Sequence, residues 1–279
     1  RGLGDVYKRQ LQIPGDFSRK LAAHQSAPIQ AVLDGRNANA SQIAFGYMQL
    51  VLARINQDLG FSEGMFPERV ALRYWFNPNL TYHWFLVPSL GGTLVMFVTL
   101  MIASLSIARE RELGTFDQLM VSPCTPTEII FAKIVPAVLM GLILGCIMLA
   151  AGVFLFQIPF HGSVLLLLGC LVLFILSIVG IGLMISSICE TQQQAILGTF
   201  TVGVPAVLVS GFATPVENMP RALQWIAEVI PLKHYLIIVQ GSFLKAIPLD
   251  TLFMSAWPLA LIAIATLSAS ILFVRSRLQ

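Results

Sequence analysis

The chain has 279 residues, of which 56% are hydrophobic and only 11% are charged, whereas soluble proteins carry about 25% charged residues. Its mean hydropathy is +0.79. A soluble enzyme cannot bury that much apolar surface, and a disordered chain would be poor in apolar residues and rich in charge. The net charge of +3 is too small to indicate a nucleic acid as a partner. The composition therefore predicts an integral membrane protein.

The start of the chain is its most polar part, because residues 1–83 hold nine of the 17 basic and six of the 14 acidic residues. We set residues 1–10 aside as a non-native or fragment-edge segment and exclude them from the fold. Residues 11–83 are predicted to form a small water-soluble α/β domain.

Two strands and one helix are predicted within this domain. Residues 29–34 alternate apolar and polar positions, as a half-buried strand does, and residues 69–76 have the pattern of a second strand. Asn39 or Ser41 is placed to cap a helix between them. The apolar face of that helix consists of Ala44, Met48, Val51, Ile55 and Leu59.

Five long segments from residue 84 onward contain no Asp, Glu, Lys or Arg. They are 84–108, 134–160, 162–189, 195–216 and 251–274. About 20 apolar residues cross a hydrocarbon core of roughly 30 Å, and a single central charge costs about 2.5–3.5 kcal/mol. We therefore predict five transmembrane helices, the fourth of them only eighteen residues long. Their approximate ranges are 84–108, 126–156, 164–189, 195–212 and 251–274.

Basic residues beside these helices set the predicted orientation. One side of the membrane carries Arg109, Arg111, Lys133, Arg275 and Arg277. The other carries Arg221, Lys233 and Lys245, spread over a longer segment. The positive-inside rule places the first group, and with it the C-terminus, in the cytoplasm. Residues 11–83 then lie outside, so we expect one further transmembrane helix upstream of this chain and six in the intact protein.

The predicted cytoplasmic connection contains two helix-start patterns. Thr115 and Gln118 have the spacing of a capping box, and Thr125-Pro126 begins a second helix with Pro at its first position. We expect a short surface helix at about 114–121, followed by a turn into the next span. Two interpretations stay open: the helix rests on lipid headgroups, or it is a lever that docks into another protein. The mixed signs of Arg109, Glu110, Arg111, Glu112 and Asp117 suit a protein partner.

The segment 213–250 is too short and too polar to cross the membrane twice. We expect Asn218 to cap a helix that has Pro220 near its first turn and ends at Pro231. One interpretation is a pair of helices on the outer leaflet, held by the interfacial rings of Trp225, His234, Tyr235 and Phe243. The other follows from the family resemblance given below, which implies a re-entrant helical pair that closes the outer mouth of a transport pathway.

Polar residues within the predicted spans give little evidence of a catalytic, proton-relay or metal site. Thr199, Phe200, Thr201 and Ser210 surround Pro205 and either face a pathway or hydrogen-bond to neighbouring helices. The spans contain no carboxylate for a proton relay, and the chain shows no Ser-His-Asp arrangement, no H-E-x-x-H zinc motif and no cysteine spacing typical of a metal site. We therefore expect neither an intramembrane enzyme nor a bound metal.

Three motifs in order resemble the permease subunit of ABC-2 type exporters. They are RERELGTFDQLMVSPCTPTEI (109–129), VGIGLMISSICETQQQA (179–195), and SGFATPVENMP (210–220) followed by PLKHYL (231–236). The resemblance extends over 84–279, and residues 16–39 are similar to the extracytoplasmic domain of some members. The chain departs from the family in its absent first span and in Cys124, where an aliphatic residue is commoner.

The resemblance implies a complex of two permeases, as copies or paralogues, and two cytoplasmic ATPase subunits in the inner or plasma membrane, with a periplasmic adaptor as a further candidate partner. The chain has no G-x-x-x-x-G-K-[ST] motif, so we expect it to bind no cofactor and the partner ATPase to bind ATP and Mg²⁺. The implied ATPase contact comprises Arg109, Glu110, Arg111, Gly114, Thr115, Phe116, Asp117, Gln118 and Leu119. The implied outer gate comprises Gly211, Phe212, Pro215, Glu217, Asn218 and Pro220.

These observations favour a non-enzymatic permease subunit of an ATP-driven exporter for drugs, lipids or other amphipathic small molecules. A polymer or glycan exporter of the same superfamily is one alternative. A membrane scaffold that anchors an extracytoplasmic adaptor through residues 11–83 is another.

Overall fold

A computed structural model describes residues 9–23, 29–33, 46–54, 83–115, 126–216, 219–244 and 249–278. The chain divides into two compact units, Arg1–Leu72 and Arg73–Gln279.

The first unit contains a short antiparallel pair of strands. Strand β1 (Arg9–Gln12) pairs with β2 (Gln30–Leu33), with Arg9 opposite Leu33 and Gln12 opposite Gln30. The strand predicted at 29–34 is therefore confirmed as β2, and its partner strand includes Arg9 and Gln10 from the segment that we set aside.

The described residues of this unit include two helical segments. Helix α1 (Phe17–Ala22) carries an ion pair between Asp16 and Lys20, 2.6 Å apart. Residues 46–54 form a second helix, in the middle of the one predicted from Ala44 to Leu59. The second strand predicted at 69–76 lies outside the described residues.

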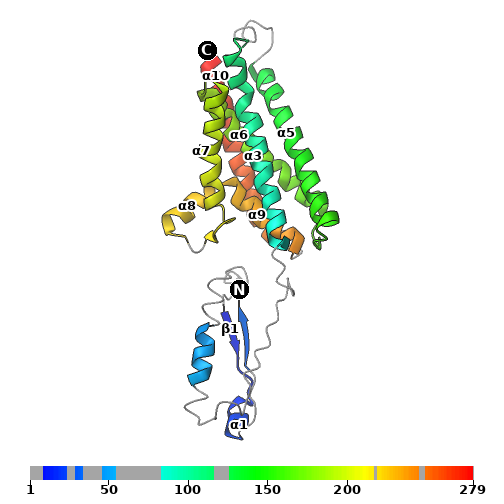
Figure 1. The fold of residues 1–279 in the computed structure, drawn as a ribbon, viewed down its shortest axis with the longest axis vertical. Coiled ribbons are helices and arrows are strands. Elements are labelled where there is room, and N and C mark those ends of the chain that lie inside the picture. The colour runs from blue at the N-terminus through cyan, green and yellow to red at the C-terminus, as the bar shows by residue number, and fades with distance from the viewer. Residues whose placement is uncertain are drawn as a thin grey trace. The chain divides into compact units, whose positions relative to one another are not determined.

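The second unit is a helical bundle (Figure 1). Its helices are α3 (His83–Glu112), α5 (Pro126–Ala150), α6 (Val164–Ile188), α7 (Gln192–Val209), α8 (Arg221–Val229), α9 (Pro231–Leu244) and α10 (Leu249–Leu278). Helix α5 continues into a π-helical segment, Ala151–Leu155. Figure 1 shows the end of α3 and the end of α10 at the same end of the bundle, as expected if the spans alternate in direction.

Among the described residues, four helices are long and apolar enough to cross a membrane: His83–Glu112, Glu128–Leu155, Val164–Ile188 and Leu252–Phe273. They coincide with four of the five predicted spans. The remaining predicted span, 195–212, corresponds to α7, which begins with three glutamines that lower its hydropathy. Helices α8 and α9 together have the length and composition of a fifth span, but an angle of 81° separates them.

Helix α6 forms the centre of the bundle and packs against α3 and α10 along its length. Its Phe174 is fully buried and stacks on Tyr235 of α9, with ring centroids 4.4 Å apart. Two glycines allow the close approach of its neighbours. A Cβ on Gly180 would lie 2.7 Å from the backbone carbon of Thr266 in α10, and one on Gly182 would lie 2.5 Å from the Cβ of Ala103 in α3. Small residues at helix contacts are typical of membrane bundles.

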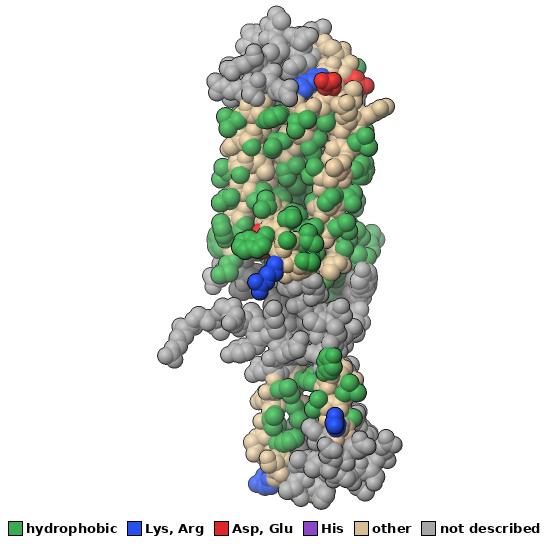
Figure 2. All heavy atoms as spheres, turned by 90° about the vertical axis from the view of Figure 1, so that its left-hand side faces the viewer, with side chains coloured by type: hydrophobic (Ala, Val, Ile, Leu, Met, Phe, Trp, Pro, Cys, Tyr) green, Lys and Arg blue, Asp and Glu red, His purple; other side chains and the backbone are tan. Residues whose placement is uncertain are grey.

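The outside of the bundle is apolar. Figure 2 shows hydrophobic side chains covering the face where α7 and α8 lie, with charged side chains toward the two ends of the bundle. Exposed residues of this kind include Leu197, Phe200, Val204 and Leu208 on α7. Such a belt matches the hydrocarbon core of a bilayer, in which apolar side chains carry no penalty.

Candidate functional site

The predicted cytoplasmic connection begins at a sharply defined helix end. Gly114 has a φ of +70°, a left-handed conformation that glycine adopts without strain. The backbone N–H of Gly114 donates to Arg111 O (3.1 Å), and that of Thr115 donates to Glu110 O (3.0 Å). This pair of bonds is the Schellman motif that ends many helices. The chain therefore leaves α3 abruptly, just after its four charged residues.

This geometry corrects the predicted start of the surface helix. Gly114 cannot belong to a right-handed helix that begins there, because its backbone closes the preceding one. The hydroxyl of Thr115 donates to Glu110 O at 3.3 Å, so it too bonds to the end of α3. The other predicted contact residues of this segment, Phe116, Asp117, Gln118 and Leu119, lie outside the described residues.

Arg111 and Glu112 join the end of α3 to the connection between α6 and α7. Arg111 Nη1 donates to Ser187 O (2.8 Å) and lies 3.4 Å from Cys189 O. Glu112 Oε2 accepts the backbone N–H of Gln192 at 2.6 Å. The cation thus lies at the carbonyl end of α6 and the anion at the amide end of α7, and both placements are favoured by the helix dipoles.

Glu110 joins the same helix end to α5, through an ion pair with Lys133. About a fifth of each side chain is exposed (20% and 19%). Arg109, in contrast, is exposed. Three consecutive charged residues, Glu110 to Glu112, therefore connect one helix end to α5, α6 and α7. We call this arrangement the α3 junction.

Just before the α3 junction, α3 is hydrogen-bonded to Ser186, a fully buried residue of α6. Its Oγ accepts the backbone N–H groups of Ile107 (2.8 Å) and Ala108 (3.1 Å) in α3. Sequence reasoning did not select Ser186, Ser187 or Gln192 as site residues, and it singled out Glu112 only for its charge. One sequence signal could have located this connection, the helix-capping spacing of Thr191 and Gln194. In the structure Thr191 Oγ1 accepts the N–H of Gln194 and marks the start of α7.

The predicted pathway residues do not share one surface. Thr199 is fully buried, and its hydroxyl lies 2.6 Å from the Ser104 hydroxyl of α3. Ser210 is also buried and donates to Val207 O (2.8 Å). Phe200 and Thr201 are instead exposed. Thr199 therefore fits the alternative interpretation, in which hydroxyls hydrogen-bond to neighbouring helices, whereas Ser210 bonds to its own helix.

The predicted outer gate is described only in part. Gly211 has a φ of +95° and turns the chain away from α7. Helix α8 begins at Arg221 with Pro220 as its N-cap residue, and Pro220 O accepts the N–H of Leu223 (2.9 Å). The helix therefore starts later than predicted, with Pro220 before its first turn and Asn218 too early to be its cap residue. Phe212 and Pro215 are partly buried, whereas Glu217 and Asn218 lie outside the described residues.

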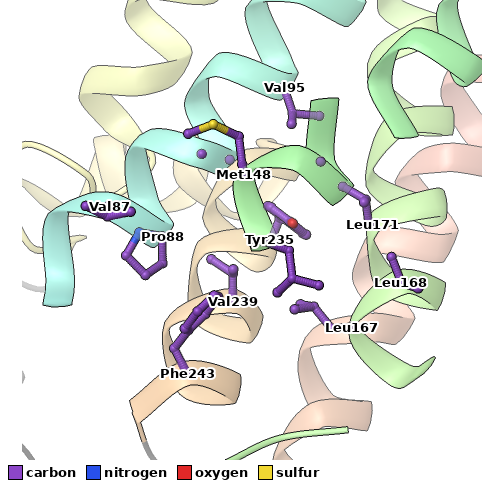
Figure 3. Close-up of a pocket in the computed structure, with 14 residues that line it drawn as sticks. Val87, Pro88, Val95, Met148, Leu167, Leu168, Leu171, Tyr235, Val239 and Phe243 are labelled. Atoms are coloured by element: carbon purple, nitrogen blue, oxygen red, sulfur yellow. The ribbon is translucent and has the colours of Figure 1, made fainter. Parts of the chain in front are cut away.

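A small apolar pocket opens at the end of the bundle where α9 lies, between α3, α5, α6 and α9 (Figure 3). Its labelled lining includes Met148, Leu171, Tyr235 and Phe243. The cavity volume is about 20 Å³, which is close to the room that one water molecule needs. A drug-sized molecule does not fit into this pocket as it stands. Within the described chain, no group of three or more His, Cys, Asp or Glu residues could hold a metal ion.

The chain matches known transport proteins over nearly its whole length. The family model described as "ABC-2 family transporter protein" matches residues 7–272. The chain is 44% identical over 273 residues to "Probable multidrug ABC transporter permease YbhR" of Escherichia coli, covering 96% of this chain and 73% of the relative. It is 30% identical to "Probable multidrug ABC transporter permease YbhS" over 83% of this chain and 63% of the relative. It is 28% identical to "Inner membrane transport permease YhhJ" over 97% of this chain and 73% of the relative.

Proposed function

Because the chain belongs to the ABC-2 family of transporter permeases, we propose that it is the transmembrane subunit of an ATP-driven exporter. The proposed cargo is drugs, lipids or other amphipathic small molecules that leave the cytoplasm. Two relatives carry the word multidrug in their names, and the apolar helices that make this a multi-pass membrane protein suit such a cargo.

The energy is proposed to come from a separate ATPase subunit, which binds ATP and Mg²⁺ and docks against the segment that follows α3. The α3 junction carries this proposal. Because Glu110, Arg111 and Glu112 bond the end of α3 to three other helices, a displacement of the next residues reaches α5, α6 and α7 together.

The outer side is proposed to contain the gate at residues 211–220 and the N-terminal unit, with residues 11–83 outside the cytoplasm and the C-terminus in the cytoplasm. A second copy or a paralogue would complete the translocation pathway. This topology is tested by labelling intact cells with an impermeant thiol reagent. A cysteine at Asn37 should react and one at Ser276 should not, and the reverse pattern would refute the orientation.

The ATPase docking is tested by copurification in the full-length protein. We expect Asp117→Lys to lose the ATPase partner and transport, because a mispaired charge at an interface costs roughly 2–5 kcal/mol. Thr115→Ala is the milder comparison, since the Thr115 N–H still closes α3. If the headgroup interpretation holds instead, Asp117→Lys keeps full copurification and full substrate-stimulated ATPase activity, and the docking proposal fails.

A further inference from the structure

Tyr235 of α9 lies within the bundle, although we expected its ring at the membrane interface with those of His234 and Phe243. These three side chains are buried, at 5%, 5% and 2% exposure, whereas Trp225 is 77% exposed. Helix α9 therefore brings a phenol into an apolar interior. Burying a hydroxyl there is unfavourable unless it finds a hydrogen-bond partner.

The ring of Tyr235 is held by two neighbouring helices. It stacks on Phe174 of α6, with an angle of 5° between the ring planes. It also lies against Gly92 of α3, where an added Cβ would be 3.1 Å from two of the ring carbons. Since these contacts fix the ring, they also fix the place of its hydroxyl. A group that is already in position loses little conformational freedom when a ligand binds to it.

The Tyr235 hydroxyl has no hydrogen-bond partner among the described residues. It is also the only side-chain oxygen or nitrogen in the described lining of the apolar pocket between α3, α5, α6 and α9. Figure 3 shows the Tyr235 oxygen among the lining side chains. Because buried polar groups in proteins are nearly always hydrogen-bonded, an unpaired hydroxyl inside a pocket indicates a place for a ligand.

A second unpaired hydroxyl lies one helical turn further along the same contact between α3, α5 and α6. Thr99 Oγ1 is buried without a partner. An added Cβ on Gly141 of α5 would lie 2.6 Å from this oxygen and 3.1 Å from Ile175 of α6. Each of these three residues is four positions, about one turn, from a residue that lines the pocket. The fold thus leaves polar groups unpaired at and just beyond the pocket.

The free space in the pocket fits one small group. Its volume is about 20 Å³, enough for one water molecule. Water suits it poorly, because a buried water makes about three hydrogen bonds and the described side chains of the lining provide one partner. A methyl group is stabilised by the apolar lining without any such bond. The atom next to that methyl group must then be able to accept the O–H of Tyr235.

We propose that this pocket binds the end of an amphipathic small molecule that carries a methyl group on a carbonyl. The methyl group occupies the free space, and the carbonyl oxygen accepts the hydroxyl proton of Tyr235. The rest of the ligand lies beside Met148, a partly exposed residue of the lining whose flexible side chain adapts to different shapes. The site lies within one chain, so binding requires neither a second permease copy nor the ATPase.

Photolabelling of the full-length protein in lipid nanodiscs tests this proposal with two matched probes. One is para-azidoacetophenone, which has an acetyl group opposite its azide. The other is para-azidoethylbenzene, which has a similar shape but no carbonyl oxygen. Light couples each probe to nearby residues, and mass spectrometry of the digested protein locates the label. Excess acetophenone distinguishes saturable labelling of a site from labelling by probe dissolved in the lipid.

We expect the ketone to give saturable label around Met148, several-fold above that of the hydrocarbon probe. Tyr235→Phe removes one oxygen and keeps the stacked ring, so it should abolish this difference. Tyr47→Phe, which removes an exposed hydroxyl from the first unit, is the matched control and should keep it. Equal labelling by the two probes in the unchanged chain would overturn the proposal, and this comparison needs no variant. A ketone preference that survives Tyr235→Phe would overturn it as well.

Competition measures the size of the group that enters the pocket. Acetophenone should displace the ketone probe at least about tenfold better than pivalophenone, its tert-butyl analogue, because three further methyl groups overfill the space. Equal competition by the two ketones would place the acyl group outside the pocket and refute the assignment.

Discussion

The carboxylate of Glu112, at the end of α3, lies 2.6 Å from the backbone nitrogen of Gln192, in the first turn of α7. The two residues are eighty positions apart in the chain, and the bond makes a side chain of one helix the cap of another. Since the first N–H groups of a helix have no partner within it, α7 depends on α3 at this point.

Removal of this cap is expected to loosen α7. Glu112→Ala should lower the unfolding free energy by about 0.3–1 kcal/mol, the usual value of an anion at a helix N-terminus, and should reduce transport more than that loss of stability explains. Glu112→Gln keeps an acceptor and should have a smaller effect. Thermal unfolding and transport in vesicles measure the two effects.

The matched control is Glu190→Gln, which removes an exposed carboxylate from the same connection. Equal losses in the Glu112 and Glu190 variants would show that only net charge matters at this end of the bundle.

The glycine contacts of α6 predict a sharp contrast between two alanine substitutions. Gly180→Ala places a Cβ 2.7–2.8 Å from backbone atoms of α10, so overpacking should cost about 1–3 kcal/mol. Gly169→Ala meets nothing within 4 Å and should be neutral, or stabilising by up to about 1 kcal/mol through helix propensity. Thermal unfolding of both variants in the same lipid is the measurement, and similar midpoints would contradict the packing of α6 on α10.

The hydroxyls of Ser104 and Thr199 allow a test between packing and pathway. A double-mutant cycle with Ser104→Ala and Thr199→Val should give a coupling energy of roughly 0.6 kcal/mol, the average for hydrogen bonds between membrane helices, with cargo preference unchanged. Thr201→Val, at an exposed site, is the comparison without a partner across helices. A change in cargo preference in Thr199→Val with zero coupling would instead make Thr199 a pathway residue.

A charge exchange tests the link between α3 and α5. Glu110→Lys and Lys133→Glu should each lower stability and transport, whereas the double variant should recover most of both, because it restores opposite charges at the same place. The pair is partly exposed (20% and 19%), so each single loss should remain near 1 kcal/mol. Failure of the double variant to recover would mean that another interaction of Lys133 or Glu110 dominates.

The membrane helices were predictable because their signal is compositional. Long charge-free segments have one stable outcome in a bilayer, so α3, α5, α6 and α10 fall within a few residues of their predicted ranges. Helix α8 was also foreseen, but its N-cap was placed at Asn218 because polar caps are commoner than the Pro220 that the structure has.

The α3 junction was less predictable because its bonds join distant residues through backbone atoms. The sequence shows that Arg111 and Glu112 are charged, but not that Ser187 O and the Gln192 N–H are their partners. The end of α3 was missed for a related reason, because it depends on the left-handed conformation of Gly114. The predicted role of Thr115 as the cap of a following helix stays a prediction, since residues 116–125 lie outside the described residues.

Gly180 and Gly182 lie on opposite sides of α6, one against α10 and the other against α3. Helices α3, α6 and α10 should therefore behave as one rigid plate. If one helix slid along another, a larger side chain would meet a position where glycine has only a hydrogen atom. A transport cycle must therefore move this plate as one body. Glycines of α5 and α7 also meet α3 and α6, but there the nearest atoms belong to side chains, which can change rotamer, so we expect bending at these margins.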